Sequence, residues 1–351
     1  MLSIRASTND DKHLPWVDYS TLTAVNMCPR WGIVNSYMGK RMAIATQRST
    51  ALEAGKAMHD VFAAVRMFEL LHTINAGDTA VVWEHGERLF GKDRWEDFHT
   101  RAMGSEDYAT AMMQSCLYML ESSGYHDDPY DKKRTLRNLE DAAILYIDRY
   151  PKKRFIPYFN RDTGVVGVEQ HFDLVIQPDD RSIQPFRFVG KIDGYCHDEL
   201  RQRRLSVHEN KTGSRIDTVW SDGFTVNHQV SGYIAAINTL FPTETRVDSA
   251  EVWGLQLPVP SKSMYGDGQS RMTATRNMGD MLEWSRWLLH TWQLILDHKE
   301  DAAAAPMYTH SCSRYFSSCA FIPLCALPYS ERKHVIDREM IENRWNPTED
   351  Q

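Results

Sequence analysis

Residues 186–211 read FRFVGKIDGYCHDELRQRRLSVHENK, and this stretch decides the predicted fold. It contains two short runs rich in β-branched and aromatic residues, Phe186–Tyr195 and Leu205–Asn210, separated by a polar turn. That pattern predicts two neighbouring strands. A third run of the same kind, Val165–Ile176, comes before them. The sequence therefore predicts a three-stranded meander.

Helical periodicity lies on both sides of the meander. Apolar residues three and four positions apart predict helix within 19–70, with a break near Gly39, and through most of 82–155. The periodicity of later segments predicts a helix over 226–240, a strand over 250–259 and a long amphipathic helix over 281–298. The expected fold class is therefore α/β, with a central mixed sheet flanked by helices.

Length and composition are those of an ordinary globular chain. The 351 residues are 42% hydrophobic and 25% charged, and the net charge is −7, so a polyanion would have to be held by a local basic groove. No segment approaches the roughly 20 apolar residues of a membrane helix, and the N-terminus lacks the apolar run of a signal peptide. We expect a cytoplasmic protein without a membrane partner.

Two carboxylates and an amine are expected to meet on the meander. If its strands pair as a hairpin, Asp193 and Glu209 share a face with Lys211 beside them. Carboxylate oxygens suit Mg²⁺ or Mn²⁺, and such an ion activates water and polarises a phosphate, while an ammonium offsets charge on phosphorus. An isolated Glu-x-Lys is usually a solvated surface pair, so the surrounding motifs decide between the two interpretations.

The order of these motifs resembles the PD-(D/E)XK nuclease superfamily, specifically the branch similar to the RecB nuclease domain and to the four-cysteine CRISPR-associated exonucleases. That branch carries Gly-x-x-x-His on an upstream helix, matched here by Gly55–His59. Gly-x-x-Asp and (Asp/Glu)-x-Lys follow on consecutive strands, matched by Gly190–Asp193 and Glu209–Lys211. A helix with Gln-x-x-x-Tyr comes next, matched by Gln229–Tyr233. The resemblance implies a restriction-endonuclease-like core.

It also implies a role for each matched residue. The expected catalytic residues are His59, Asp193, Glu209, Lys211, Gln229 and Tyr233. The expected metal ligands are His59, Asp193, Glu209 and the carbonyl of Asn210, with Mg²⁺ or Mn²⁺ as the ion. Gln229 and Tyr233, one helical turn apart, would hold the scissile strand or brace the lysine. Glu169 is either a further acid near the site or a surface carboxylate.

The function that the resemblance implies is a metal-dependent DNA exonuclease. It would act on single-stranded or duplex ends in recombination, repair or end processing, in a bacterial or phage-infected cell, with a helicase or recombination protein as a partner. A structure-specific endonuclease with the same site is one alternative. A DNA-end-binding protein whose nuclease has decayed is another, although the complete set of His59, Asp193, Glu209 and Lys211 favours an active enzyme.

The cysteines form a second pattern. Cys28, together with Cys312, Cys319 and Cys325, resembles the split cysteine set that holds a 4Fe-4S cluster in the same branch. The six-residue gap after Cys312 departs from the usual two, which leaves zinc as the alternative. For Cys116 and Cys196 the sequence predicts a structural role in the protein interior. The expected organisation is a nuclease domain over 1–300, with a helical insertion at about 75–160, and a segment over 301–351 that closes onto Cys28.

Overall fold

The contacts of the chain divide it into two units. The computed structural model describes residues 2–41, 49–241, 246–259, 268–314, 317–342 and 344. Unit 1 contains the described residues within 1–47, 171–190 and 278–350, and unit 2 those within 48–170 and 191–277. The sequence predicted instead one domain over 1–300, because its patterns mark elements and not the contacts between them. That boundary at residue 300 stays a prediction.

Unit 1 carries segments from near both ends of the chain. Strand β1 (Leu2–Ala6) pairs antiparallel with β7 (Val168–Pro178), and β2 (Trp16–Val17) pairs parallel with β8 (Phe186–Asp198). The helices are α1 (Tyr19–Met27), α2 (Pro29–Trp31), a π-helix (Gly32–Tyr37), α10 (Met278–His298), α11 (Ile322–Ala326) and α12 (Tyr329–Arg338). Two short pairs complete the unit: β3 (Lys40–Arg41) with β14 (Ile341–Glu342), and β12 (Ser313–Arg314) with β13 (Ser317–Ser318). The β3–β14 pair joins an N-terminal segment to a C-terminal one.

Unit 2 is built on a mixed sheet, which confirms the predicted α/β class. Its strands lie in the order β8, β9 (Arg204–Gly213), β10 (Ser249–Gln256) and β11 (Gln269–Thr275). Strand β9 is antiparallel to β8 and parallel to β10, so the chain crosses over between β9 and β10 through α8 (Thr218–Thr225) and α9 (His228–Leu240). Strand β4 (Phe155–Pro157) extends the sheet beside β8, and β5 (Phe159–Asn160) pairs with β6 (Val165–Val166).

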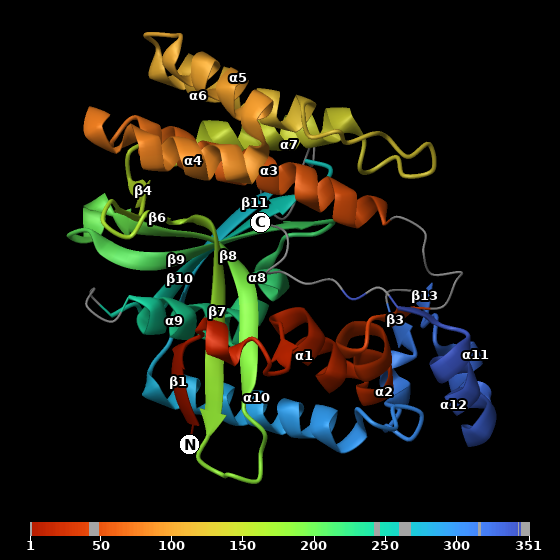
Figure 1. Cartoon of the computed structure of the whole chain (residues 1–351). Coiled ribbons are helices and arrows are strands. Elements are labelled where there is room, and N and C mark those ends of the chain that lie inside the picture. The colour runs from red at the N-terminus through yellow and green to blue at the C-terminus, as the bar shows by residue number, and fades with distance from the viewer. Residues whose placement is uncertain are drawn as a thin grey trace. The chain divides into compact units, whose positions relative to one another are not determined.

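Helix α3 (Thr50–Leu71) is the central helix of unit 2. It packs against β4 and β9 on one side and against α4, α6 and α7 on the other, so every side chain from Val61 to Leu71 is buried. The predicted insertion is a set of four helices: α4 (Thr79–Phe90), α5 (Lys92–Met103), α6 (Tyr108–Glu121) and α7 (Leu136–Arg149). Figure 1 shows them above the strands of unit 2, with α8 and α9 below.

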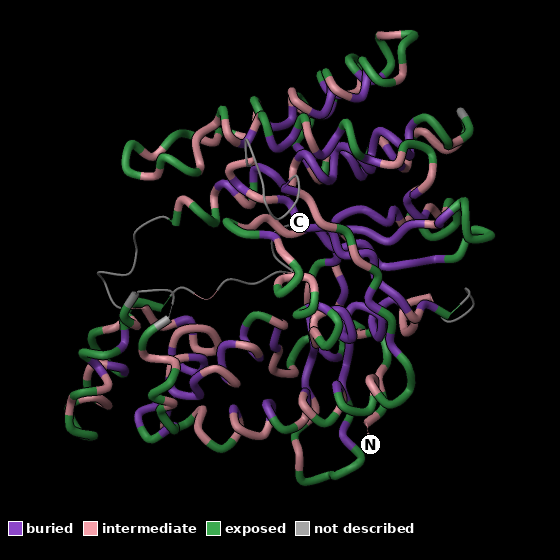
Figure 2. Tube along the Cα trace, turned by 180° about the vertical axis from the view of Figure 1, so that it is seen from behind, coloured by how far each residue is buried: buried purple, intermediate pink, exposed green. Residues whose placement is uncertain are grey.

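Several helices of unit 2 begin at a side-chain cap. Asp107, Thr135, Asp217 and Asn227 accept a hydrogen bond from a main-chain N–H in the first turn of α6, α7, α8 and α9. Figure 2 shows buried segments running through the strands and the helices that cover them. Within the described residues, no helix combines the length and apolar character needed to cross a bilayer.

The packing of α4 on α5 gives a test of the insertion. A Cβ added at Gly86 would lie 2.3 Å from the ring of the buried Trp95. Gly86→Ala should therefore lower the free energy of unfolding by about 1–3 kcal/mol through overpacking, as measured by urea denaturation. Gly223→Ala on α8 is the control, because a Cβ there meets nothing within 4 Å. Equal stability of the two variants would show that α4 and α5 do not pack in this way.

Candidate metal centre and thiol cluster

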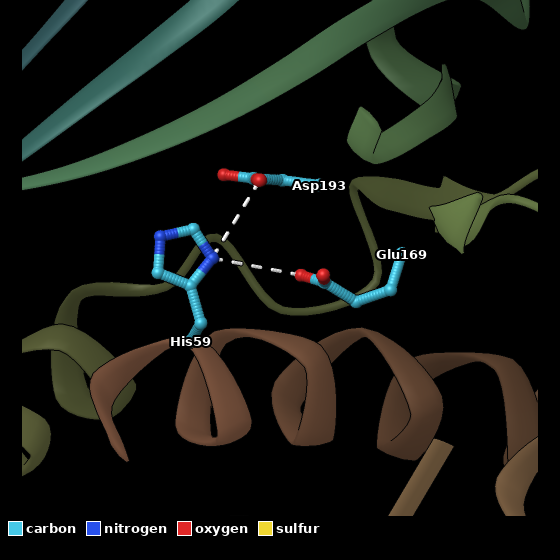
Figure 3. A group of neighbouring side chains, drawn as sticks. All are labelled: His59, Glu169 and Asp193. Carbon is cyan, nitrogen blue, oxygen red and sulfur yellow. Dashed lines mark ion pairs between the residues drawn. The ribbon is translucent and has the colours of Figure 1, made fainter. Parts of the chain in front are cut away.

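Three side chains of unit 2 converge on one point. His59, Glu169 and Asp193 each place one potential ligand atom within 4.8 Å of the others. The Nδ1 atom of His59 lies 3.5 Å from Asp193 Oδ1 and 3.6 Å from Glu169 Oε1, as Figure 3 shows. The histidine comes from α3 and the carboxylates from β7 and β8. The structure thus brings together two predicted ligands, His59 and Asp193, with Glu169, which the sequence left undecided.

The donor set fits a hard divalent cation. Ligand atoms sit about 2.0–2.1 Å from Mg²⁺ in octahedral geometry, so neighbouring ligands are about 3 Å apart and opposite ones about 4 Å. The distances from His59 Nδ1 to Asp193 Oδ1 and Glu169 Oε1, 3.5 and 3.6 Å, fall in that range. Glu209 Oε2 is also buried without accepting a hydrogen bond from any described residue. Buried acceptors that lack a donor are the atoms that a bound cation would satisfy.

Glu209 and Lys211 lie on β9, beside this group. The antiparallel pairing of β8 and β9 begins at Gly194 with His208, so Asp193 and Glu209 come at the next position along the two strands. The ammonium of Lys211 forms an ion pair with Glu209 Oε1. Glu209 does not belong to the compact group of three, but its carboxylate interacts with the charges of Asp193 and His59. Its role as a metal ligand stays a prediction.

Asn210 connects the site to a buried arginine. Its main-chain N–H donates to Asp193 Oδ2 at 2.8 Å. In the amide orientation that satisfies both neighbours, its side-chain oxygen accepts from Arg66 Nη1 at 3.1 Å and its nitrogen donates to the Tyr146 hydroxyl at 3.3 Å. Sequence reasoning missed Arg66, although a single arginine in the apolar run from Val61 to Phe68 signals a buried charge with a specific partner. The carbonyl of Asn210 stays a predicted ligand.

Gln229 and Tyr233 contact the main chain of β8. Gln229 Nε2 donates to the Tyr233 hydroxyl at 2.8 Å, and that hydroxyl donates to the carbonyl of Lys191 at 2.9 Å. These bonds brace the strand two residues before Asp193, and the catalytic roles of both residues stay predictions. Lys191 itself pairs with Glu169 Oε2 at 2.7 Å. Sequence reasoning missed this lysine, although its spacing from Asp193 puts both on one strand face.

The clustered charges shift three pKa values. Desolvation favours the neutral imidazole of His59, but Asp193 and Glu169 outweigh it and raise its pKa to about 9. Burial and the charge of Asp193 raise the pKa of Glu209 to about 7, against the opposing effects of Lys211 and His59. Burial would raise the pKa of Glu169, yet His59 and Lys191 hold it below its usual range. Without a metal ion, His59 is therefore protonated at neutral pH.

The four cysteines of the predicted set lie around one cavity in unit 1. Cys28, at the end of α1, and Cys312, Cys319 and Cys325 line a cavity of about 290 Å³. Each of the other three thiols also contributes to the raised pKa of Cys319, after the larger effect of burial. Two further bonds join the flanking segments: Ser311 Oγ donates to the Met27 carbonyl at 2.6 Å, and Arg30 N–H donates to the Pro306 carbonyl at 3.0 Å.

The spacing of the thiols bears on the choice between a single zinc ion and a cluster. No three of them lie within 4.8 Å of one another among the described residues. Tetrahedral zinc with Zn–S bonds of about 2.3 Å requires sulfur atoms about 3.8 Å apart. A multinuclear cluster places its thiolates further apart, because each binds a different metal atom. Cys116 and Cys196 are buried in the core of unit 2, in agreement with a structural role.

Metal binding at His59 should release protons. A ligating imidazole must give up the proton that it carries at pH 7.5 when its pKa is about 9. Calorimetric titration of the protein with Mn²⁺ in two buffers of different ionisation enthalpy should detect this release, and His59→Gln should remove about one proton from it. His126→Gln, at an exposed histidine, is the matched control. Equal proton release from His59→Gln and the wild type would rule out His59 as a ligand.

Comparison with protein-family models finds no match for this sequence, and comparison with curated proteins finds none either.

Proposed function

We propose that this protein is a metal-dependent deoxyribonuclease with a restriction-endonuclease-like core in unit 2 and Mg²⁺ or Mn²⁺ as its cofactor. The convergence of His59, Glu169 and Asp193, from three separate elements, supports the proposal most directly. The Glu209–Lys211 pair on the adjoining strand adds the ammonium that phosphodiester hydrolysis needs near the ion. The mixed sheet between two layers of helices agrees with such a core.

In this proposal, some side chains of the site bind the metal ion and another stabilises charge on the phosphate. A bound divalent ion would supply a Lewis acid that polarises the phosphate and lowers the pKa of water. His59, Asp193 and Glu169 would hold the ion, and their positions are set by α3, β8 and β7. The side chain of Lys211 is 33% exposed, so its ammonium can reach a phosphate while Glu209 orients it. Tyr233 fixes β8 next to Asp193 through the Lys191 carbonyl.

We propose further that the substrate is DNA and that cleavage starts at an end, on the basis of the resemblance to the RecB-like branch. Purified protein should then degrade end-labelled linear DNA when Mg²⁺ or Mn²⁺ is present and not in chelator. Closed circular DNA should survive under the same conditions. Cleavage of circles at a comparable rate would identify an endonuclease, and absence of all cleavage with retained binding would identify a decayed end-binding protein.

Substitution of Lys211 should affect catalysis but not DNA binding. Lys211→Ala should lower the rate of cleavage by about a hundred- to a thousandfold, because an electrostatic group aimed at the reacting centre is lost, while affinity for DNA changes little. Single-turnover cleavage and filter binding measure the two effects. Lys92→Ala on α5, where the lysine side chain is 70% exposed, is the control. Persistent cleavage by Lys211→Ala would remove this lysine from the mechanism.

We propose that the four thiols hold a 4Fe-4S cluster that joins the two ends of unit 1. Thiolates are soft ligands that prefer iron–sulfur clusters or zinc to hard cations, so this site and the carboxylate site select different metals. Cys28, Cys312, Cys319 and Cys325 line one cavity, and among the described residues no three of them lie within 4.8 Å of one another, which favours the cluster over zinc. The residues of the cavity come from two segments, 27–31 at the end of α1 and in α2, and 307–325 up to α11, so a cluster would fasten the N-terminal segment to the C-terminal one.

Metal content tests this second site. Protein purified without oxygen should be brown and contain about four iron and four acid-labile sulfide per chain. Cys319→Ser should lose both and unfold at a lower temperature, whereas Cys116→Ala should retain them, because Cys116 lies in the core of unit 2. A content of one zinc ion per chain with no sulfide would contradict the cluster and identify the four thiols as a zinc site.

A further inference from the structure

A cavity of about 500 Å³ opens in unit 2 at the end of α3 away from His59. His59 and His72 are 13 residues apart, which is about 20 Å along a helix, so this cavity is separate from the candidate metal centre. One wall is apolar and includes Leu70, Ile74, Ile156 and Phe159. The lining also includes the cations Lys153 and Arg203, the imidazoles of His72 and His197, and the carboxylates of Asp78 and Glu199, of which Asp78 pairs with Arg161. Its size is typical of sites for small ligands.

Lys153 is held in place by a buried acid. Its main-chain N–H donates to Glu69 Oε2 at 2.9 Å, and Glu69 is fully buried on α3. The residue has φ 60°, in the left-handed region that a non-glycine residue adopts at a cost. Its ammonium lies 4.9 Å from the centre of the Tyr108 ring, and its charge also acts on the carboxylate of Glu69. Lys153 lines the cavity, where its ammonium can meet a bound anion.

Arg203 and the two histidines complete the polar side. Arg203 also has a left-handed φ, 58°, and its guanidinium pairs with the exposed Glu199 at 3.2 Å, a contact that an incoming anion can replace. The carbonyl of Arg203 accepts from His197 Nδ1 at 2.9 Å, and the carbonyl of Phe68 accepts from His72 Nδ1 at 3.0 Å. Each ring therefore carries its proton on Nδ1 and presents Nε2 as its other polar atom.

We propose that this cavity binds the terminal phosphate and base of a nucleotide. Lys153 and Arg203 hold the phosphate monoester, and Phe159 with the apolar wall receives the flat base. This chemistry is shared by a free nucleoside monophosphate and by the 5′-phosphorylated end of a DNA strand. The proposal does not depend on nuclease activity or on the metal centre.

The test uses the whole protein in chelator, so that the metal centre plays no part. Binding of 2′-deoxyadenosine 5′-monophosphate is measured by calorimetry, and deoxyadenosine should bind at least tenfold more weakly. A 5′-phosphorylated oligonucleotide that binds more tightly than both the mononucleotide and its 5′-hydroxyl counterpart would identify a strand end as the source. Preference for the mononucleotide would identify a free nucleotide.

Matched variants locate the site. Lys153→Gln with Arg203→Gln should weaken nucleotide binding at least tenfold, while Lys152→Gln, at the exposed neighbouring lysine, should not. Thermal unfolding checks the double variant, and the two single variants replace it if it does not fold. No binding by the wild type, binding unchanged in the variants, or binding lost in Lys211→Ala but kept in the double variant would overturn the proposal.

Discussion

The candidate metal centre depends on carboxylates that are buried close together. Oxygens of Glu169 and Asp193 lie within 4.8 Å of each other, and Glu209 is buried next to them. Two like charges about 4 Å apart repel by about 4 kcal/mol at an effective dielectric constant of 20. His59, Lys191 and Lys211 offset this repulsion, and each of their side chains is at least a third exposed. The acids are therefore inside and the cations at the opening, where a metal ion from solvent can take over their role.

Strands β8 and β9, which carry Asp193 and Glu209, are fixed from both faces of the sheet. On one face, Arg66 and Tyr146 hold the side chain of Asn210, whose N–H reaches Asp193. On the other, Tyr233 holds the carbonyl of Lys191. A Cβ at Gly194 would come within 2.6 Å of Arg66 Nε, so the glycine after Asp193 allows this arginine to approach the strand. The geometry of the site is thus a property of the core of unit 2.

The sequence predicted the elements better than it predicted the site. Periodicity found α9, α10, β8 and β9 closely, because each buries a regular face or a continuous run. It could not place Glu169, because this residue has φ 49° within β7, and both it and Val168 are buried. That backbone costs about 1–3 kcal/mol and breaks the alternation from which strand faces are read. The sequence also could not predict the division into two units, because β7 and β8 continue through the boundaries at residues 170 and 190.

The C-terminal part of unit 1 has a small core, which bears on the structural role of the proposed cluster. After α10, few side chains of the described segment are buried: Ala302, Ala303, Ala305, Phe321, Leu324 and Ile336. Three of these are alanines, so this segment of about forty residues buries too little apolar area to stay folded on its own core. A main-chain hydrogen bond from Arg30 and the β3–β14 pair attach this segment to the N-terminal one. Each such hydrogen bond adds little to the free energy of unfolding in water. In the proposed 4Fe-4S site, metal–thiolate bonds between Cys28 and the three later cysteines would supply the cross-link that this small core lacks.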